Sequence, residues 1–353
     1  MGDILVVYFV PRHRGASRYG DAVIWNWRSG TLLGRILSET YGTAPTFFDK
    51  DHLLFYSFPP SSSVESGLAR SNQVGLLIYR IPTTATIIHQ EPPNADAHVP
   101  SYPSLEPTLI LEFPKLHSGY RVHEHTLLDT LADQGDVAYR GLAEVAYSHI
   151  STVALRLSVA QKEGKKGERR PTTHYSIHVN LDFLPSYLSE NQAKEITRVP
   201  WAQWGVASTR WFIDNTAVNH GTTYGSLHLR FFCADNTTQL LTLLVFDPHI
   251  ISRQTPHVLD EIEQQKVLEG QGLAFMNQQI DRRIASNIKT VIHTGFEEPV
   301  ESTLPFMIVN RIQAPIHEDW YIHGEYLVGG PSRSLNYGDA SFSLYKLQFS
   351  HEN

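Results

Sequence analysis

Apolar residues along this chain gather in short runs with the length of β-strands, and one such run occurs twice near the N-terminus. The segment from Asp3 to Pro11 returns 48 residues later, from Asp51 to Pro59, with Asp, Leu, Tyr and Pro at the same positions. A second strand candidate follows each copy. A repeat of about 40 to 50 residues made of short strands is typical of the blades of a β-propeller.

The clearest hairpin extends over residues 22–37, where two apolar runs flank a Ser-Gly pair. Gly30 can adopt the positive φ that a tight hairpin turn demands. Because successive side chains of a strand alternate between its faces, we expect Val23, Trp25 and Trp27 to share one face.

Strand candidates continue to the C-terminus. They are Pro45–Phe48, Val74–Ile81, Thr86–His89, Thr108–Phe113, Ser151–Ala160, Tyr175–Phe183, Ile196–Gln203, Ala207–Ile213, Ser226–Ala234, Leu240–Phe246, Ile288–His293, Met307–Arg311, Glu325–Val328 and Phe342–Phe349. At four strands per blade, the roughly twenty strands predict about five to seven blades. The sequence therefore predicts a single all-β domain over residues 1–353, a β-propeller of four-stranded blades.

Polar and proline-rich stretches interrupt this pattern. Long loops are predicted near residues 60–73, 92–107 and 162–170, of which the second contains five prolines. One or two short helices are expected in the connections. Partly helical spacing of apolar residues predicts one over Pro256–Gly270, and Leu127–Ala132 is the second candidate.

Composition narrows the classes of partner. The 353 residues carry a formal net charge of −7, which disfavours nucleic-acid binding because phosphate contacts need a basic face. No apolar run reaches the roughly 18 residues of a membrane span. Cys233 is the single cysteine, so no internal disulfide can form, which fits a reducing compartment. We therefore expect a cytoplasmic or nuclear protein that binds neither nucleic acid nor membrane.

The turn of the first hairpin resembles a known repeat. Trp25-Asn26-Trp27-Arg28-Ser29-Gly30 is similar to the strand-to-turn element of a WD-type repeat, with Asn26 in place of the usual Asp. Roughly residues 1–90 more closely resemble the C-terminal, propeller-like region of fungal F-box proteins. That region has an Asp-led apolar strand, a Trp-Asn-Trp turn and a Leu-Leu-Ile-Tyr strand, as at Leu76–Tyr79 here.

This resemblance implies a β-propeller that selects substrates for a Skp-Cullin-F-box ubiquitin ligase. The helical F-box segment that docks on a Skp-type adaptor is absent from this sequence, which opens directly on a strand. Adaptor binding is therefore not expected of this chain by itself.

Histidines provide the main metal hypothesis. His117, His123 and His125 stand close together, and beside His123 and His125 a third ligand could come from Glu112 or Asp129. The alternative is that these are surface or edge-strand histidines in a polar loop region. We favour the alternative because no further ligand stands at a diagnostic spacing, and we predict neither metal nor cofactor.

A second histidine pair, His174 and His178, stands four residues apart on a strand candidate. That spacing puts both side chains on one face but about 13 Å apart, which is too far for one ion.

Catalytic motifs are weak. There is no Gly-x-Ser-x-Gly elbow and no phosphate-binding glycine loop. Cys233 lies among apolar residues, which predicts a buried side chain rather than a catalytic thiol. Carboxylates occur in groups at Asp260-Glu261-Glu263, Glu297-Glu298 and Glu318-Asp319. Adjacent residues on a strand point to opposite faces, so these groups are not catalytic dyads by themselves.

Two further features have open interpretations. The basic segment Lys162–Arg170 is either a solvated hairpin tip, which we favour, or a nuclear import signal or a contact for an acidic partner. Trp201, Trp204 and Trp211 either pack between blades, which we favour, or anchor a partner protein.

From the sequence we predict a non-enzymatic protein-interaction module whose loops bind a protein partner. The alternative is a propeller hydrolase with carboxylates in a central channel. No catalytic, cofactor-binding or metal-binding residue is assigned, and no individual partner-binding residue is predicted.

Overall fold

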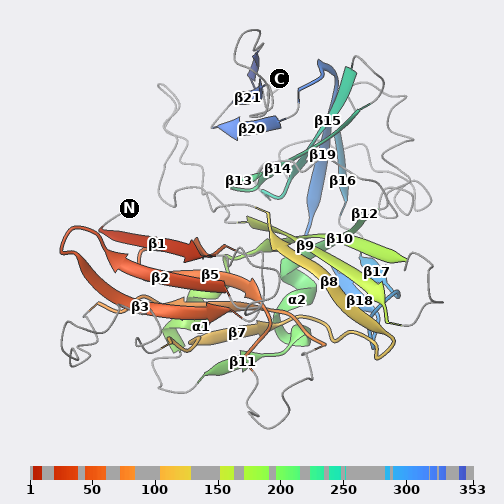
Figure 1. Cartoon of the computed structure of the whole chain (residues 1–353). Coiled ribbons are helices and arrows are strands. Elements are labelled where there is room, and N and C mark those ends of the chain that lie inside the picture. The colour runs from red at the N-terminus through yellow and green to blue at the C-terminus, as the bar shows by residue number, and fades with distance from the viewer. Residues whose placement is uncertain are drawn as a thin grey trace, which may run out of the picture.

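Antiparallel β-sheets make up most of the described chain in the computed structural model (Figure 1). The structure describes residues 3–9, 20–38, 44–60, 72–83, 104–128, 152–162, 171–190, 196–214, 223–233, 238–247, 251, 283–286, 289–317, 319–323, 326–330 and 342–346. Within these ranges there are five larger sheets, numbered here from first to fifth in chain order, and one separate pair of strands.

The first sheet contains β1 (Ile4–Phe9), β2 (Gly20–Asn26) and β3 (Thr31–Ser38) in that order. β2 and β3 form the predicted hairpin, and Gly30 in its turn has a φ of 69°. The side-chain oxygen of Asn26 accepts a hydrogen bond from the main-chain N–H of Ser29 at 3.0 Å, which stabilises the turn.

The second sheet has the order β11-β7-β6-β5-β4. Its strands are β4 (Thr46–Phe47), β5 (His52–Ser57), β6 (Gly75–Arg80), β7 (Leu109–Glu112) and β11 (Thr197–Val199), and only β11 joins in parallel. The repeated Asp-led segments therefore form β1 and β5, each paired antiparallel with the next strand of the chain.

The third sheet has the order β12-β10-β9-β8. It contains β8 (Tyr120–Leu127), β9 (Thr152–Gln161), β10 (Thr172–Asn180) and β12 (Thr209–Asp214). A separate pair, β17 (Thr290–Ile292) and β18 (Val300–Ser302), adds Ile292 and Val300 to the core beside it.

The fourth and fifth sheets complete the series. The fourth, in the order β13-β14-β15-β19-β16, contains β13 (Thr223–Tyr224), β14 (Leu227–Cys233), β15 (Thr238–Val245), β16 (Arg283–Ser286) and β19 (Phe306–Pro315). The fifth contains β20 (Asp319–His323), β21 (Tyr326–Gly330) and β22 (Ser343–Lys346).

The described helices are α1 (Leu184–Glu190) and α2 (Trp201–Ser208), and neither was predicted. The predicted strand Ile196–Gln203 is wrong beyond Val199, where β11 ends. Pro200 has a φ of −69° in the N-cap position of α2, and the helix packs Trp204 into the core, so tertiary packing decides its conformation.

Neither predicted helix is found among the described residues. Leu127 is the last residue of β8, so no helix begins there, and residues 129–132 lie outside the described ranges. The predicted helix Pro256–Gly270, the strand Thr86–His89 and most of the three long loops also lie outside them.

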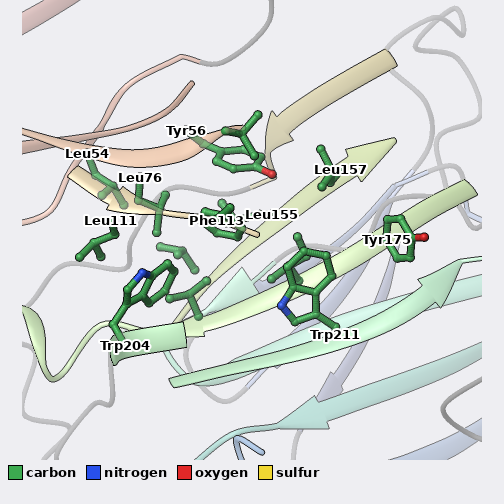
Figure 2. Close-up of a cluster of buried hydrophobic side chains, with 14 of the residues drawn as sticks. Leu54, Tyr56, Leu76, Leu111, Phe113, Leu155, Leu157, Tyr175, Trp204 and Trp211 are labelled. Carbon is green, nitrogen blue, oxygen red and sulfur yellow. The ribbon is translucent and has the colours of Figure 1, made fainter. Parts of the chain in front are cut away.

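The sheets pack face to face in chain order, because the inner strands bury apolar side chains on both faces. On β5, Leu53 and Phe55 face the first sheet, whereas Leu54 and Tyr56 face the third. Figure 2 shows the second of these interfaces, where Tyr56, Leu76 and Phe113 meet Leu155, Tyr175 and Trp211.

The later interfaces follow the same rule. Phe212 of the third sheet packs with Leu244, Phe246 and Phe306 of the fourth. The opposite face of the fourth sheet packs on the fifth through residues that include Leu229, Leu243, Trp320 and Leu327.

The all-β prediction is confirmed in this form: antiparallel sheets of three to five strands, with short helices in the connections. No sheet closes on itself in the described part of the chain. The arrangement of the sheets as a ring of blades stays a prediction.

Candidate functional site

The first histidine group is divided between core and surface. His125 on β8 is 5% exposed, and its ring meets the rings of Tyr56 and Phe58 with centroids 5.6 and 5.1 Å apart. Burial lowers the pKa of His125 to about 4. His123 is exposed beside it, because the pairing of β8 with β9 shifts register between Val122 and Glu124.

The remaining candidate metal ligands are engaged elsewhere or not described. Glu112 forms an ion pair with Arg198 at 3.1 Å, and Nδ1 of His117 accepts a hydrogen bond from the N–H of Gly119. Asp129 lies outside the described ranges. Where the chain is described, no three His, Cys, Asp or Glu side chains come close enough to hold a metal ion.

The second histidine pair lies on β10, facing the fourth sheet. His174 is hydrogen-bonded to the Ser158 hydroxyl at 2.7 Å, whereas His178 is fully buried against the rings of His228 and Phe246. The sequence placed both on one face, but it did not predict the partner rings, because these come from the next sheet.

His178 belongs to a buried polar cluster between the third and fourth sheets. Asp214 and Arg230 form an ion pair across this interface, and the Arg230 guanidinium lies 6.0 Å from the centroid of the Phe212 ring. Burial, and then the nearby His228 and Arg230, lower the pKa of His178 well below its usual 6.5. The ring of His178 is therefore neutral at physiological pH.

Arg210 extends this cluster toward the β17–β18 pair. Its Nε donates to the Leu304 carbonyl at 2.7 Å and its Nη1 to the Thr290 hydroxyl at 2.8 Å. Burial lowers the pKa of Arg210 to about 10, so it remains a cation. Because Arg210 and His178 are both 0% exposed, the cluster joins sheets inside the protein and is closed to a substrate.

The described carboxylates do not form a catalytic arrangement. Glu297 and Glu298 are both exposed in the segment between β17 and β18, and Asp319 begins β20 in another sheet. Glu318 and the group at residues 260–263 lie outside the described ranges.

Two other candidates are described only in part. Cys233 is the last residue of β14, but its side chain lies outside the described part, so its predicted burial stays a prediction. Of the basic segment, the structure describes Lys162, whose main-chain N–H donates to the Gly119 carbonyl at 2.8 Å.

The tryptophan group lies in the core between the second and third sheets. Trp204 and Trp211 are 3% and 0% exposed, and Trp201 packs against both rings. All three contact the ring of Phe113, with centroids 5.3 to 6.1 Å apart. The structure thus places them between two packed sheets, and the favoured interpretation that these sheets are propeller blades stays a prediction.

An exposed apolar surface lies on the first sheet, on the side opposite to the second sheet. This outer face comprises Leu5, Phe9, Trp25, Trp27 and Leu37, whose exposed fractions are 47%, 52%, 43%, 61% and 42%. Leu5 lies directly opposite Trp25 in the β1–β2 pairing. Large apolar side chains gathered on one exposed face are uncommon unless the face binds something.

The outer face also contains an ion pair. Arg35 of β3 donates from Nε and Nη2 to the two carboxylate oxygens of Asp21 on β2, at 2.6 and 2.7 Å. Asp21 stands opposite both Phe9 and Leu37, so the charged pair lies among the apolar side chains.

The order of the sheets explains why this face is exposed. The second, third and fourth sheets are each covered on both faces, whereas the first and fifth stand at the ends of the series. The fifth sheet likewise exposes Tyr321, Tyr326 and Leu344, at 40%, 40% and 65%. Sequence reasoning placed Val23, Trp25 and Trp27 on one face but did not identify that face as uncovered.

None of the helices that the structure describes is long and apolar enough to span a membrane. Comparison of the chain with family models, with curated proteins and with solved structures found no match.

Proposed function

We propose that this chain is a non-enzymatic protein-interaction module and that its partner binds the outer face of the first sheet. The observation that carries the proposal is the group of five large apolar residues exposed on that face, two of them tryptophans. Tryptophan is among the residues that contribute most to protein–protein binding, because its large ring buries much area with few rotatable bonds.

The chemistry of the face indicates what such a partner presents. Leu5, Phe9 and Trp25 offer a pleated apolar surface, which favours apolar or aromatic side chains opposite them. Asp21 and Arg35 already satisfy each other, and the carboxylate of Asp21 can accept further hydrogen bonds from a polar group of the partner. The partner is therefore a protein with an apolar patch that contains a few polar groups.

The fold that we propose beneath this function is propeller-like. Five sheets follow one another along the chain, each packed against the next, which is the relationship between neighbouring propeller blades. A closed ring would bring the outer faces of the first and fifth sheets together. Because Leu5 and Leu344 remain 47% and 65% exposed, we propose an open arc whose first sheet is free to bind.

Substrate selection for a ubiquitin ligase is the narrower role implied by the resemblance, and it remains part of the proposal. It predicts that the protein bound at the outer face is ubiquitinated when the chain is joined to a Skp-type adaptor. An unmodified partner in a reconstituted ligase reaction would remove this role and leave the binding function intact.

The test compares the wild-type chain with a variant in which Trp25 and Trp27 are both changed to serine. Each is used to isolate proteins from a lysate, recovery is quantified, and the protein most depleted by the variant is purified and titrated directly. Loss of a hot-spot tryptophan costs about 2 kcal/mol of binding free energy, which raises the dissociation constant roughly 30-fold.

The control variant is Tyr321→Ser, which alters the exposed face of the fifth sheet. It should bind the purified partner like the wild type. If the double tryptophan variant also binds every recovered protein with wild-type affinity, the outer face is not the binding surface and the proposal fails.

A further inference from the structure

The first strand has an open stretch of main-chain edge at Ile4 and Val6 in the described part of the chain. β1 lies at the edge of the first sheet, as Figure 1 shows, and among the described residues it pairs with β2 alone. The N–H of Trp27 donates to the Asp3 carbonyl, and the register continues without a shift to Phe9. In an antiparallel pair such bonded positions alternate, so the odd-numbered residues of β1 bond to β2. The N–H and C=O groups of Ile4 and Val6 therefore point away from the sheet.

The opposite edge of the same sheet is covered by the chain itself. The N–H of Leu105 donates to the Arg35 carbonyl on β3 at 2.7 Å, and the Ser104 hydroxyl accepts from the N–H of Leu37 at 3.4 Å. Ile4 and Val6 of β1 have no such cover in the described part of the chain. Its six residues, Ile-Leu-Val-Val-Tyr-Phe, include no charge and no proline, the two features that usually protect an exposed edge from pairing.

We propose that β1 pairs antiparallel with β1 of a second copy of this chain, so that two first sheets join into one continuous sheet. The symmetric register centred on Leu5 places Ile4 opposite Val6 of the second copy, and the outward main-chain groups of both then bond across the interface. This strand has no charged side chain that would select a charged foreign strand, and its mostly apolar residues match those of a second copy.

Side chains support the same register. Leu5 is 47% exposed on the outer face, and at the symmetry centre it lies directly against Leu5 of the second copy. The central pair is not bonded through the main chain, and in such pairs the Cα atoms lie about 4.5 Å apart, which brings the side chains together. The two outer faces then lie side by side, so a dimer presents the binding surface twice.

The expected dimer is weak. Pairing along a few edge residues buries less than the roughly 1,200 Å² of a standard stable interface. A dissociation constant of about 10–100 µM is therefore expected, and sedimentation of the full chain from about 1 to 300 µM should show a reversible shift from monomer to dimer.

The first test removes the outward N–H. Val6→Pro deletes a donor that the β1–β2 ladder does not use, and proline is tolerated where an edge N–H faces outward. Val6→Ala loses more of the inward packing but keeps the N–H. We expect Val6→Pro to weaken association at least tenfold and Val6→Ala to change it less than threefold, with both variants retaining the wild-type circular dichroism spectrum.

The second test fixes the register. Leu5→Cys should form a disulfide-linked dimer on mild oxidation, because Cα atoms at the symmetry centre are within bonding range. The Val7→Cys variant should form no disulfide-linked dimer, because residue 7 would face Asp3 of the second copy. The wild type, with Cys233 as its single cysteine, should form none either. Three results would each overturn the proposal. The first is a wild-type chain that stays monomeric to about 300 µM, and the second is a Val6→Pro variant that dimerises like the wild type. The third is cross-linking of the Val7→Cys variant but not of the Leu5→Cys variant. None of these outcomes affects the Trp25 and Trp27 binding test.

Discussion

The imidazole rings of His178 and His228 meet edge to face, with 4.5 Å between their centroids, inside the interface between the third and fourth sheets. His178 is fully buried, and the ring of Phe246 also stacks on it, with the centroids 4.6 Å apart. With Arg230 nearby, a proton on either ring would add a positive charge where one is already buried. The interface therefore depends on a neutral His178.

The first prediction concerns pH. His178 and His125 both have folded pKa values below the usual 6.5, so the unfolded chain binds more protons than the folded chain in mild acid. Their contribution to stability is complete above about pH 6.5 and is lost as the pH falls toward the folded pKa values. The free energy of unfolding should drop by about 1.4 kcal/mol per pH unit for each histidine.

Urea denaturation from about pH 7.5 to pH 5 measures this slope. His125→Phe should reduce it by about 1.4 kcal/mol per pH unit. An identical slope in wild type and His125→Phe would show that burial of His125 does not shift its pKa.

The second prediction concerns the ion pair of Asp214 and Arg230. Their side chains are only 9% and 7% exposed, so Asp214→Asn leaves a buried guanidinium without its counter-charge. We expect a loss of about 3–5 kcal/mol in the free energy of unfolding, measured by chemical denaturation. Glu301→Gln, which breaks an exposed pair with Lys289, should cost less than about 1 kcal/mol. Equal losses of unfolding free energy in Asp214→Asn and Glu301→Gln would refute the buried pairing of Asp214 with Arg230.

The third prediction concerns two buried tyrosines. The Tyr56 hydroxyl is buried and has no hydrogen-bond partner among the described residues, whereas the Tyr175 hydroxyl donates to the Thr294 carbonyl at 2.8 Å. Tyr56→Phe should raise the free energy of unfolding by about 1 kcal/mol, and Tyr175→Phe should lower it by a similar amount. The melting temperatures of both variants test this prediction. A destabilised Tyr56→Phe variant would contradict the claim that the Tyr56 hydroxyl has no hydrogen-bond partner.

The fourth prediction concerns the first hairpin. Gly30 has a φ of 69°, and no atom lies near the position that a side chain would occupy, so only backbone strain opposes substitution. Gly30→Ala should cost about 1–2 kcal/mol, and Gly30→Asn should cost less because asparagine tolerates this conformation. Equal effects of the two changes on the melting temperature would argue against a left-handed turn residue.

Most strands were predictable because their apolar runs are decided locally. β5, β6 and β9 follow their predicted bounds closely, and the β2–β3 hairpin has its glycine where the turn requires it. β8 is missing from the predicted strands, because the sequence Tyr-Arg-Val-His-Glu-His-Thr-Leu is largely polar, although the favoured interpretation of its histidines allowed an edge strand there. Its pairing with β9 determines its conformation.

Helices and the outer face were not predictable for a different reason. The segment of α2 is rich in tryptophan, which strands also favour, and it is helical because Trp204 then packs against Phe113. Which face of the first sheet stays exposed depends on the order in which whole sheets pack. Val23 shares a face with Trp25 yet is only 6% exposed, so the pattern of one strand does not identify the surface.

The measurement that tests the central claim most directly is hydroxyl-radical footprinting of the full chain, read at individual tryptophans by mass spectrometry. On an exposed outer face, Trp25 and Trp27, at 43% and 61% exposure, should oxidise at least about tenfold faster than Trp204, Trp211 and Trp320, which are at most 3% exposed. If Trp25 and Trp27 react as slowly as those three in the dilute, monomeric chain, the outer face is covered and the proposed binding surface does not exist.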